Sequence, residues 1–144
     1  MSQQLVANGR YRIQTAFRRE NLGEQSAEAP LTLLPEEGDN FTWEVAFDGT
    51  DSYTLRNVKT GSYLGDDEAP QTGPVAALKG ASKPFFWKIE PAPDDEETFT
   101  LSPKGSNGTT RLAFSPLRIY PPAVAWLPPS VGYRPDELWR LVKV

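Results

Sequence analysis

Three runs of acidic side chains are the residues best suited to acid–base or metal chemistry in this sequence of 144 residues. They are Glu36-Glu37, Asp66-Asp67-Glu68 and Asp94-Asp95-Glu96-Glu97. A glycosidase would need two carboxylates placed across a cleft, and a calcium-binding loop would need spaced Asp, Asn and Gly residues. The three runs lie among turn-forming residues, where charge usually meets water. We therefore expect solvated turns and no metal site.

Histidine and cysteine are absent from the chain. Without histidine there is no Ser-His-Asp triad and no imidazole to ligate a metal or transfer a proton. Without cysteine there are no disulfides, iron–sulfur clusters or thiolate nucleophiles. Carboxylate pairs, lysine and tyrosine remain possible catalytic groups, but nothing in their spacing points to an active site. We predict that the chain is not an enzyme and uses no cofactor.

The net charge is −4, from 15 basic and 19 acidic residues. This balance argues against nucleic acid or an anionic membrane as a partner, because both attract a basic face. The basic cluster of Arg10, Arg12, Arg18 and Arg19 is too sparse for a heparin-binding loop, and we expect a solvated edge. There is no secretory signal pattern, and no apolar stretch approaches the ~18 residues of a membrane helix. We expect a cytoplasmic monomer.

The elements that would position a site come from a threefold repeat. Three segments alternate aromatic, polar, aliphatic and polar residues: Tyr11-Arg-Ile-Gln14, Tyr53-Thr-Leu-Arg56 and Phe99-Thr-Leu-Ser102. Three others read tryptophan, charged and aliphatic: Trp43-Glu-Val45, Trp87-Lys-Ile89 and Trp139-Arg-Leu141. Alternation with a period of two predicts strands with one buried face. The chain thus divides into units 9–48, 49–93 and 94–144, each of roughly 45 residues.

Each unit also holds two weaker strand candidates between its anchors. They are Asn21–Gly23 with Leu31–Leu34, Ser62–Gly65 with Val75–Leu78, and Arg111–Phe114 with Leu117–Tyr120. Propellers usually need four or more blades, whereas three units of four strands close as a six-stranded barrel capped by hairpins. We predict an all-β chain, a single β-trefoil domain over residues 1–144. Its core would contain Tyr11, Trp43, Tyr53, Trp87, Phe99 and Trp139.

Sugar-binding trefoils of the ricin type carry Gln-x-Trp in their repeats. Here the residues two before the repeat tryptophans are Phe41, Phe85 and Glu137, which weakens that lectin interpretation. We expect these tryptophans to pack in the core rather than stack on a ligand.

Two connections are candidates for binding another protein. The first, residues 23–30, is small and polar, and joins two predicted strands between Leu22 and Leu31. It is either an ordinary connection or an extended loop that a protease binds as a substrate, on a base stiff enough to limit the ordering cost. The second runs from Tyr120 to Pro135 and carries five prolines besides Trp126 and Leu127. It either presents these apolar side chains to a partner or folds Trp126 back over the barrel.

Both ends of the chain resemble one family. Asn8-Gly-Arg-Tyr-Arg-Ile13 is similar to the opening of many fungal trefoils. Leu22-Gly23, Leu31-Thr-Leu-Leu-Pro-Glu-Glu-Gly38 and Trp43-Glu-Val45 resemble the first repeat of mushroom serine protease inhibitors of the cospin/cnispin type. The closing Tyr133-Arg-Pro-Asp-Glu-Leu-Trp139 resembles their Tyr-Pro-Pro-x-Glu-Leu-Trp strand.

This resemblance implies a cytosolic fungal protein directed against serine proteases of feeding animals. The family's reactive loops lie between the second and third strands or between the eleventh and twelfth. The first maps to Glu24, Gln25, Ser26, Ala27, Glu28 and Ala29, with Ser26, Ala27 or Glu28 entering the primary pocket of the protease. The second maps to the segment after Tyr120, with Ala123, Val124, Ala125, Trp126 and Leu127 as the candidates.

The residues of these segments also narrow the expected target. Neither contains lysine, and the one arginine is Arg134, so ordinary trypsin inhibition is not expected. Ala27 would suit an elastase-like or subtilisin-like pocket, and Leu127 a chymotrypsin-like one. Two alternatives remain: a mushroom cysteine protease inhibitor, which shares the fold but uses other loops, and a fungal defence lectin that binds glycans.

Overall fold

The computed structural model describes residues 6–16, 20–24, 31–35, 37–65, 83–92, 95–104, 111–114, 124–127 and 138–144. Their strands are β1 (Gly9–Thr15), β2 (Asn21–Glu24), β3 (Leu31–Leu34), β4 (Trp43–Phe47), β5 (Tyr53–Asn57), β6 (Trp87–Ala92), β7 (Asp95–Pro103), β8 (Arg111–Phe114), β9 (Val124–Leu127) and β10 (Trp139–Lys143). A short 3-10 helix, η1 (Asp39–Phe41), precedes β4. In this part of the chain no helix is long and apolar enough to cross a membrane.

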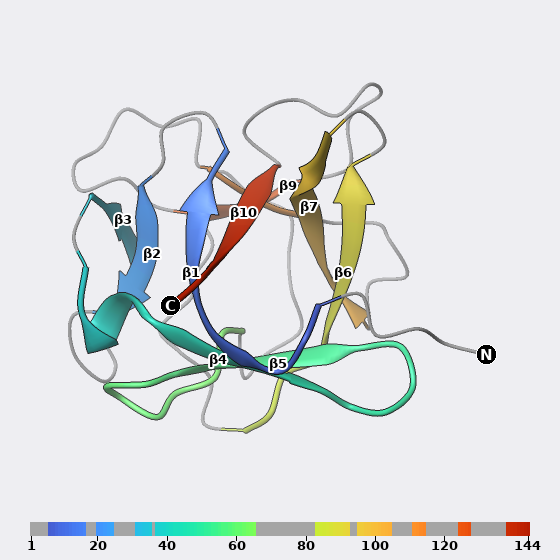
Figure 1. The fold of residues 1–144 in the computed structure, drawn as a ribbon, viewed down its shortest axis with the longest axis horizontal. Helices are drawn as coiled ribbons and strands as arrows, with labels where there is room; N and C mark the ends of the chain where they lie inside the picture. Colours follow the sequence, from blue (N-terminus) through green and yellow to red (C-terminus); the bar gives the residue numbers. More distant parts are fainter. Residues whose placement is uncertain are drawn as a thin grey trace.

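Six of the strands close into an antiparallel barrel (Figure 1). The order β1–β4–β5–β6–β7–β10 returns to β1 through the β10–β1 pairing. Strands β2 and β3 form a hairpin that continues the sheet from β1, and β8 and β9 form a separate hairpin. The barrel therefore takes the first and last strand of every repeat, as the sequence predicts. The middle strands of the first and third repeats form hairpins.

The aromatic anchors of each repeat are direct partners on neighbouring strands of the barrel. Tyr11 lies opposite Trp43, Tyr53 opposite Trp87, and Phe99 opposite Trp139. Directly opposed side chains on one face of an antiparallel pair are in contact, and aromatic pairs are among the stabilising ones. The repeat in the sequence is thus a repeat of one cross-strand pair, and its register fixes which faces turn inward.

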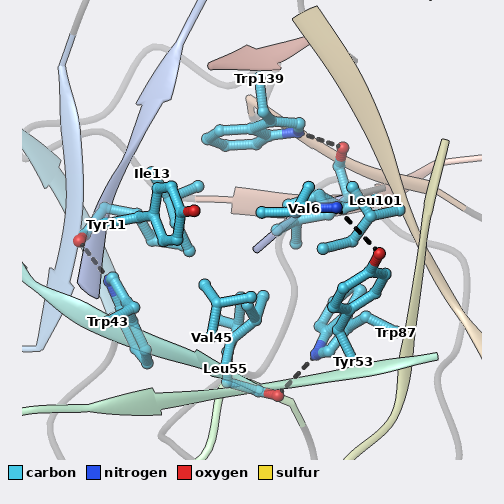
Figure 2. Close-up of a cluster of buried hydrophobic side chains, with 14 of the residues drawn as sticks. Val6, Tyr11, Ile13, Trp43, Val45, Tyr53, Leu55, Trp87, Leu101 and Trp139 are labelled. Atoms are coloured by element: carbon cyan, nitrogen blue, oxygen red, sulfur yellow. Dashed lines mark hydrogen bonds between the residues drawn. The ribbon is translucent and has the colours of Figure 1, made fainter. Parts of the chain in front are cut away.

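The interior of the barrel is built on these anchors (Figure 2). Trp43, Trp87 and Trp139 are completely buried, and Tyr11 and Tyr53 are nearly so. Phe99 is partly buried and packs against the same cluster. Each aromatic side chain buries about 150–250 Å², so these residues supply much of the apolar burial. The tryptophans are packing residues, as expected.

Each indole N–H donates to a backbone carbonyl in the segment that follows the first barrel strand of the same repeat. Trp43 donates to the oxygen of Leu22 over 2.8 Å, Trp87 to Leu64 over 2.7 Å, and Trp139 to Leu112 over 2.9 Å. The three leucines are completely buried. A buried donor without a partner would be costly, so this bond explains how a large indole is accommodated. It also ties each cap segment to the barrel.

The segment before β1 fills the barrel at a position that breaks the threefold symmetry. Val6 is buried, and its N–H donates to the hydroxyl of Tyr53 over 3.0 Å (Figure 2). The hydroxyl of Tyr11 donates to the oxygen of Ala7 over 2.8 Å. Phe99, the anchor of the third repeat, has no hydroxyl. The first two anchors therefore hold the N-terminal segment as well as the core.

Some weaker strand predictions differ from the structure. In the second repeat Tyr63 makes only an isolated bridge to Arg56, and Val75–Leu78 lies outside the described residues. In the third repeat Leu117–Tyr120 also lies outside them, and the partner of β8 is β9. The acidic run expected as a turn is partly strand, because β7 begins at Asp95, which pairs with Ala92. The β6–β7 pairing continues almost to the connection, so the turn is shorter than predicted.

Candidate functional site

The first candidate segment begins inside the β2–β3 hairpin. Glu24 is the last residue of β2 and pairs with Leu31, the first residue of β3. The remaining predicted residues, Gln25, Ser26, Ala27, Glu28 and Ala29, lie outside the described residues. They connect two strands whose paired ends the structure does place. How well this segment can be held in one conformation therefore depends on how its two strand ends are anchored.

The base of this connection is anchored on the barrel by two contacts. Leu22 and Leu33 are paired and completely buried, and the Leu22 carbonyl accepts the indole hydrogen bond of Trp43. Gly23 packs so closely against the ring of Phe41 and the carbonyl oxygen of Asn40 that an added Cβ would lie closer than 3.0 Å to both. The β2 strand of this hairpin is therefore closely packed against the residues before β4.

The second candidate segment is mainly a strand, where the sequence suggests a loop. Val124, Ala125, Trp126 and Leu127 form β9, and they pair with Phe114, Ala113, Leu112 and Arg111 of β8. Their backbone is used in pairing, so it is not an extended loop free to enter a protease. Ala123, like residues 115–122, lies outside the described residues. Residues 115–123 join β8 to β9 in the sequence.

A polar pocket of about 140 Å³ lies on the outer wall of the barrel, between the first and second repeats. It is lined by Arg10 of β1, Glu44 of β4, Arg56 and Asn57 of β5, and Val58 and Gly61 of the following turn. The register places Arg10 opposite Glu44, and Glu44 opposite Arg56. Three charged side chains of alternating sign thus lie side by side on three neighbouring strands.

Two side chains of the pocket, those of Arg56 and Asn57, are held by hydrogen bonds, and two others are exposed without an ion pair among the described residues. The Nε–H of Arg56 donates to the Gly61 oxygen over 3.0 Å, and its guanidinium lies 5.6 Å from the ring centre of Tyr63. The side chain of Asn57 is occupied with the backbone of its surroundings, because it donates to Asn40 and accepts from Lys59 and Thr60. Arg10 and Glu44 are exposed. Within the described residues, neither of these two side chains forms a salt bridge.

Three carboxylates among the described residues, Glu37, Asp48 and Asp51, form ion pairs. Glu37 is exposed and pairs with Arg12 over 3.3 Å. Asp48 and Asp51, in the β4–β5 turn, face Lys104, whose Nζ lies 3.1 Å from Asp51 Oδ1. Among the residues that the structure describes, no group of three acidic side chains could hold a metal ion.

Asp48 organises the β4–β5 turn through its charge. Desolvation alone would raise its pKa, but hydrogen bonds to the carboxylate from the N–H groups of Thr50, Ser52 and Asp51 and from the Thr50 hydroxyl outweigh it. The pKa of Asp48 is thereby lowered from 3.8 to about 2. Such a carboxylate is fixed in its ionised form at neutral pH and serves the turn. It is not a general acid.

No family model and no curated protein matches this sequence. Among solved structures, the chain is similar to a ricin B-like lectin of Macrolepiota procera in complex with lactose (TM-score 0.82, 21% identity, 99% of this chain and 100% of that one). It is also similar to a designed threefold symmetric protein, ThreeFoil (0.78, 21%, 94% and 99%). A third is a proteinase inhibitor from Coprinopsis cinerea (0.70, 20%, 96% and 99%).

The fold is a β-trefoil. The closed barrel and these similarities, each covering almost the whole of both chains, agree on it. At such low identities the likeness concerns the fold, and fold by itself does not determine function. The trefoil neighbours include both lectins and an inhibitor, so the site residues have to carry the functional argument.

The wall pocket is the site that the sequence patterns did not predict. The sequence predicts a solvated basic edge at Arg10, and it places Glu44 and Arg56 in strands without indicating a site. Their relation becomes visible once the repeats are aligned as a trefoil, because Arg10 precedes the first tyrosine anchor and Glu44 follows the first tryptophan. Arg56 stands three residues after the second tyrosine anchor. The strand register then brings the three together.

Proposed function

We propose that this trefoil is a protein inhibitor of serine proteases that presents residues Glu24–Ala29 as a substrate-like segment. The observation that carries the proposal is the anchored base of the β2–β3 hairpin. The Trp43–Leu22 hydrogen bond and the Gly23–Phe41 contact hold β2 on the barrel, and β3 is paired along its length with β2. A segment held at its base loses less conformational entropy on binding, which favours tight and slowly cleaved complexes.

The residue types of the segment support this proposal and suggest its target. Residues 24–29 are small or polar and contain neither lysine nor arginine. Trypsin has an acidic primary pocket that selects basic side chains. We therefore infer that Ala27 enters an apolar primary pocket of the elastase or subtilisin kind. The resemblance at both ends of the sequence supports a fungal, cytoplasmic protein that acts in defence.

The proposal is tested with a panel of elastase, subtilisin, chymotrypsin, trypsin and papain. We expect inhibition of elastase or subtilisin, and at least roughly 100-fold weaker inhibition by Ala27→Asp, because the protease pocket would bury an unpaired charge. Ala27→Arg should gain inhibition of trypsin. Ala123→Asp, in the other hairpin connection, is the matched control and should inhibit like the parent chain.

Each other outcome of the panel has a definite meaning. Inhibition that survives Ala27→Asp but not Ala123→Asp would move the reactive segment to the third repeat. Inhibition of papain alone would favour the cysteine protease alternative. Inhibition of no protease would reject the inhibitor proposal altogether.

Glycan binding is the second candidate function. It is favoured by the wall pocket, whose charged side chains can both donate and accept hydrogen bonds, and by the lectin among the similar structures. A glycan array and a titration with lactose test it. Saturable binding together with failure of the protease panel would make this the better proposal.

A further inference from the structure

We propose that the wall pocket formed by Arg10, Glu44 and Arg56 binds the hydroxyl groups of a neutral saccharide. This inference deepens the second candidate function and is independent of protease inhibition. The pocket lies between two repeats on the barrel wall, and the segment proposed to enter a protease leaves from the β2–β3 hairpin. The two proposed sites share no residue.

The threefold symmetry of the barrel provides an internal comparison for the pocket. In the strand register, the row Arg10–Glu44–Arg56 corresponds to Ser52–Lys88–Ser102 and to Thr98–Arg140–Gln14. Ser52, Ser102 and Thr98 are buried, whereas Arg10, Glu44 and Arg56 are exposed. Two equivalent rows thus complete the barrel without an acidic residue or a pair of exposed arginines. The barrel itself does not require the charges of the first row.

The chemistry of the row matches a polyol better than an ion. The Glu44 carboxylate accepts hydrogen bonds, and it can take two from neighbouring hydroxyls. The guanidinium groups of Arg10 and Arg56 have only donors, and these suit the oxygen lone pairs of the same hydroxyls. A bound anion would face Glu44, which lies directly between the two arginines. A neutral ligand that donates and accepts avoids this repulsion.

The geometry of Arg56 gives the pocket a preorganised donor. Its Nε–H is bonded to Gly61, and Tyr63 lies against its guanidinium, so its terminal nitrogens are held at the pocket. Gly61 has a φ of +77°, a conformation that favours glycine, and an added Cβ would lie 3.5 Å from Arg56 Nη2. The pocket volume of about 140 Å³ suits one sugar residue rather than a long chain.

The test is an NMR titration of the ¹⁵N-labelled full chain with lactose, methyl α-mannoside and N-acetylglucosamine. We expect at least one sugar to shift the amide of Gly61 and the Nε–H of Arg56 saturably. Glu44→Gln and Arg56→Lys should each weaken that binding about tenfold, because a hydrogen bond to a charged group is lost. Lys88→Gln, at the equivalent position of the next row, should leave it unchanged.

Four outcomes would overturn the inference. Sodium sulfate that shifts Gly61 and Arg56 where no sugar does would identify an anion site. Sugar shifts that leave Gly61 and Arg56 untouched would retain glycan binding but place it elsewhere. Sugar binding at Gly61 that is insensitive to Glu44→Gln and Arg56→Lys would reject the role of these side chains. No shift with any sugar would remove both the pocket proposal and the glycan-binding candidate.

Discussion

The first two repeats and the third repeat build the same corner of the trefoil in different ways. In all three, a tryptophan donates its indole N–H to the carbonyl of a buried leucine. In the first two, a glycine follows that leucine and a phenylalanine stands two residues before the tryptophan, as Gly23 with Phe41 and Gly65 with Phe85. In the third, the corresponding residues are Ala113 and Glu137.

The comparison separates a contact that all three repeats share from a contact that only the first two repeats have. A Cβ on Gly23 or Gly65 would lie closer than 3.0 Å to the neighbouring phenylalanine ring, so the glycine and the ring depend on each other. The third repeat has lost the ring and carries a buried Ala113 in place of the glycine. The indole hydrogen bond is thus common to all three corners, and the glycine–phenylalanine contact is an additional constraint on two of them.

The largest expected effect on stability comes from replacing the buried tryptophan that each repeat contains. Trp43→Ala, Trp87→Ala and Trp139→Ala should each lower the free energy of unfolding by about 3–5 kcal/mol, because each leaves a cavity and a buried carbonyl without its donor. The three losses should agree within about 1 kcal/mol, since burial and hydrogen bonding are alike. Urea unfolding measures them. If one tryptophan proved dispensable, the corners would not be equivalent.

Adding one methyl group should distinguish the repeats. Gly23→Ala is expected to cost roughly 1–3 kcal/mol through overpacking against Phe41, and Gly65→Ala at least as much, because its φ of +151° is unfavourable for alanine. The reverse change in the third repeat, Ala113→Gly, should cost only about 0.5–1 kcal/mol. Thermal unfolding of the three variants provides the comparison.

A double variant tests the cause of this difference. Combining Gly23→Ala with Phe41→Leu should cost less than the sum of the two single changes, because the smaller side chain makes room for the added methyl group. Strict additivity would show that the ring is not what excludes a side chain at position 23.

The N-terminal segment offers a smaller test of asymmetry. Tyr53→Phe leaves the buried N–H of Val6 without the hydroxyl that it bonds, at a cost of about 1–2 kcal/mol. Tyr11→Phe should cost less, because the Tyr11–Ala7 bond is only partly buried. The third repeat already has Phe99 at this position. Equal losses in both variants, measured by urea unfolding, would contradict this order.

A small pH dependence of stability is expected from the β4–β5 turn. The folded pKa of Asp48 is about 2, below its ordinary value of 3.8, so ionised Asp48 stabilises the fold above about pH 4. This contribution is lost as the pH falls from about 4 to 2. Since the turn is solvated, we expect roughly 1 kcal/mol. Asp48→Asn should remove that part of the pH dependence in melts recorded at pH 5 and 2.5.

The barrel could be predicted from the sequence because its information is local and repeated. Alternation around Tyr11 and Trp43 recurs in each repeat, and burial of one face leaves little freedom in the register. The third-repeat hairpin shows the limit of this approach. The sequence predicts Leu117–Tyr120 as the second strand of this hairpin, whereas the structure pairs β8 with Val124–Leu127, which the sequence suggests as a loop.

The sites were harder to predict than the barrel, for a related reason. Residues 24–29 could be recognised as a connection from the strands on either side of them. Arg10, Glu44 and Arg56 form no motif, because they come from three strands and meet only through the register. Such a pocket can be found from sequence only after the repeats have been aligned and the outward positions compared.

The most direct test of the inhibitor proposal is the site at which an inhibited protease slowly cuts the chain. After prolonged incubation with elastase or subtilisin, mass spectrometry of the protein should show one cut, inside Glu24–Ala29, with inhibition retained. That result would show the segment bound in the manner of a substrate. A single cut among Ala123–Leu127, or no inhibition by any protease of the panel, would contradict the account.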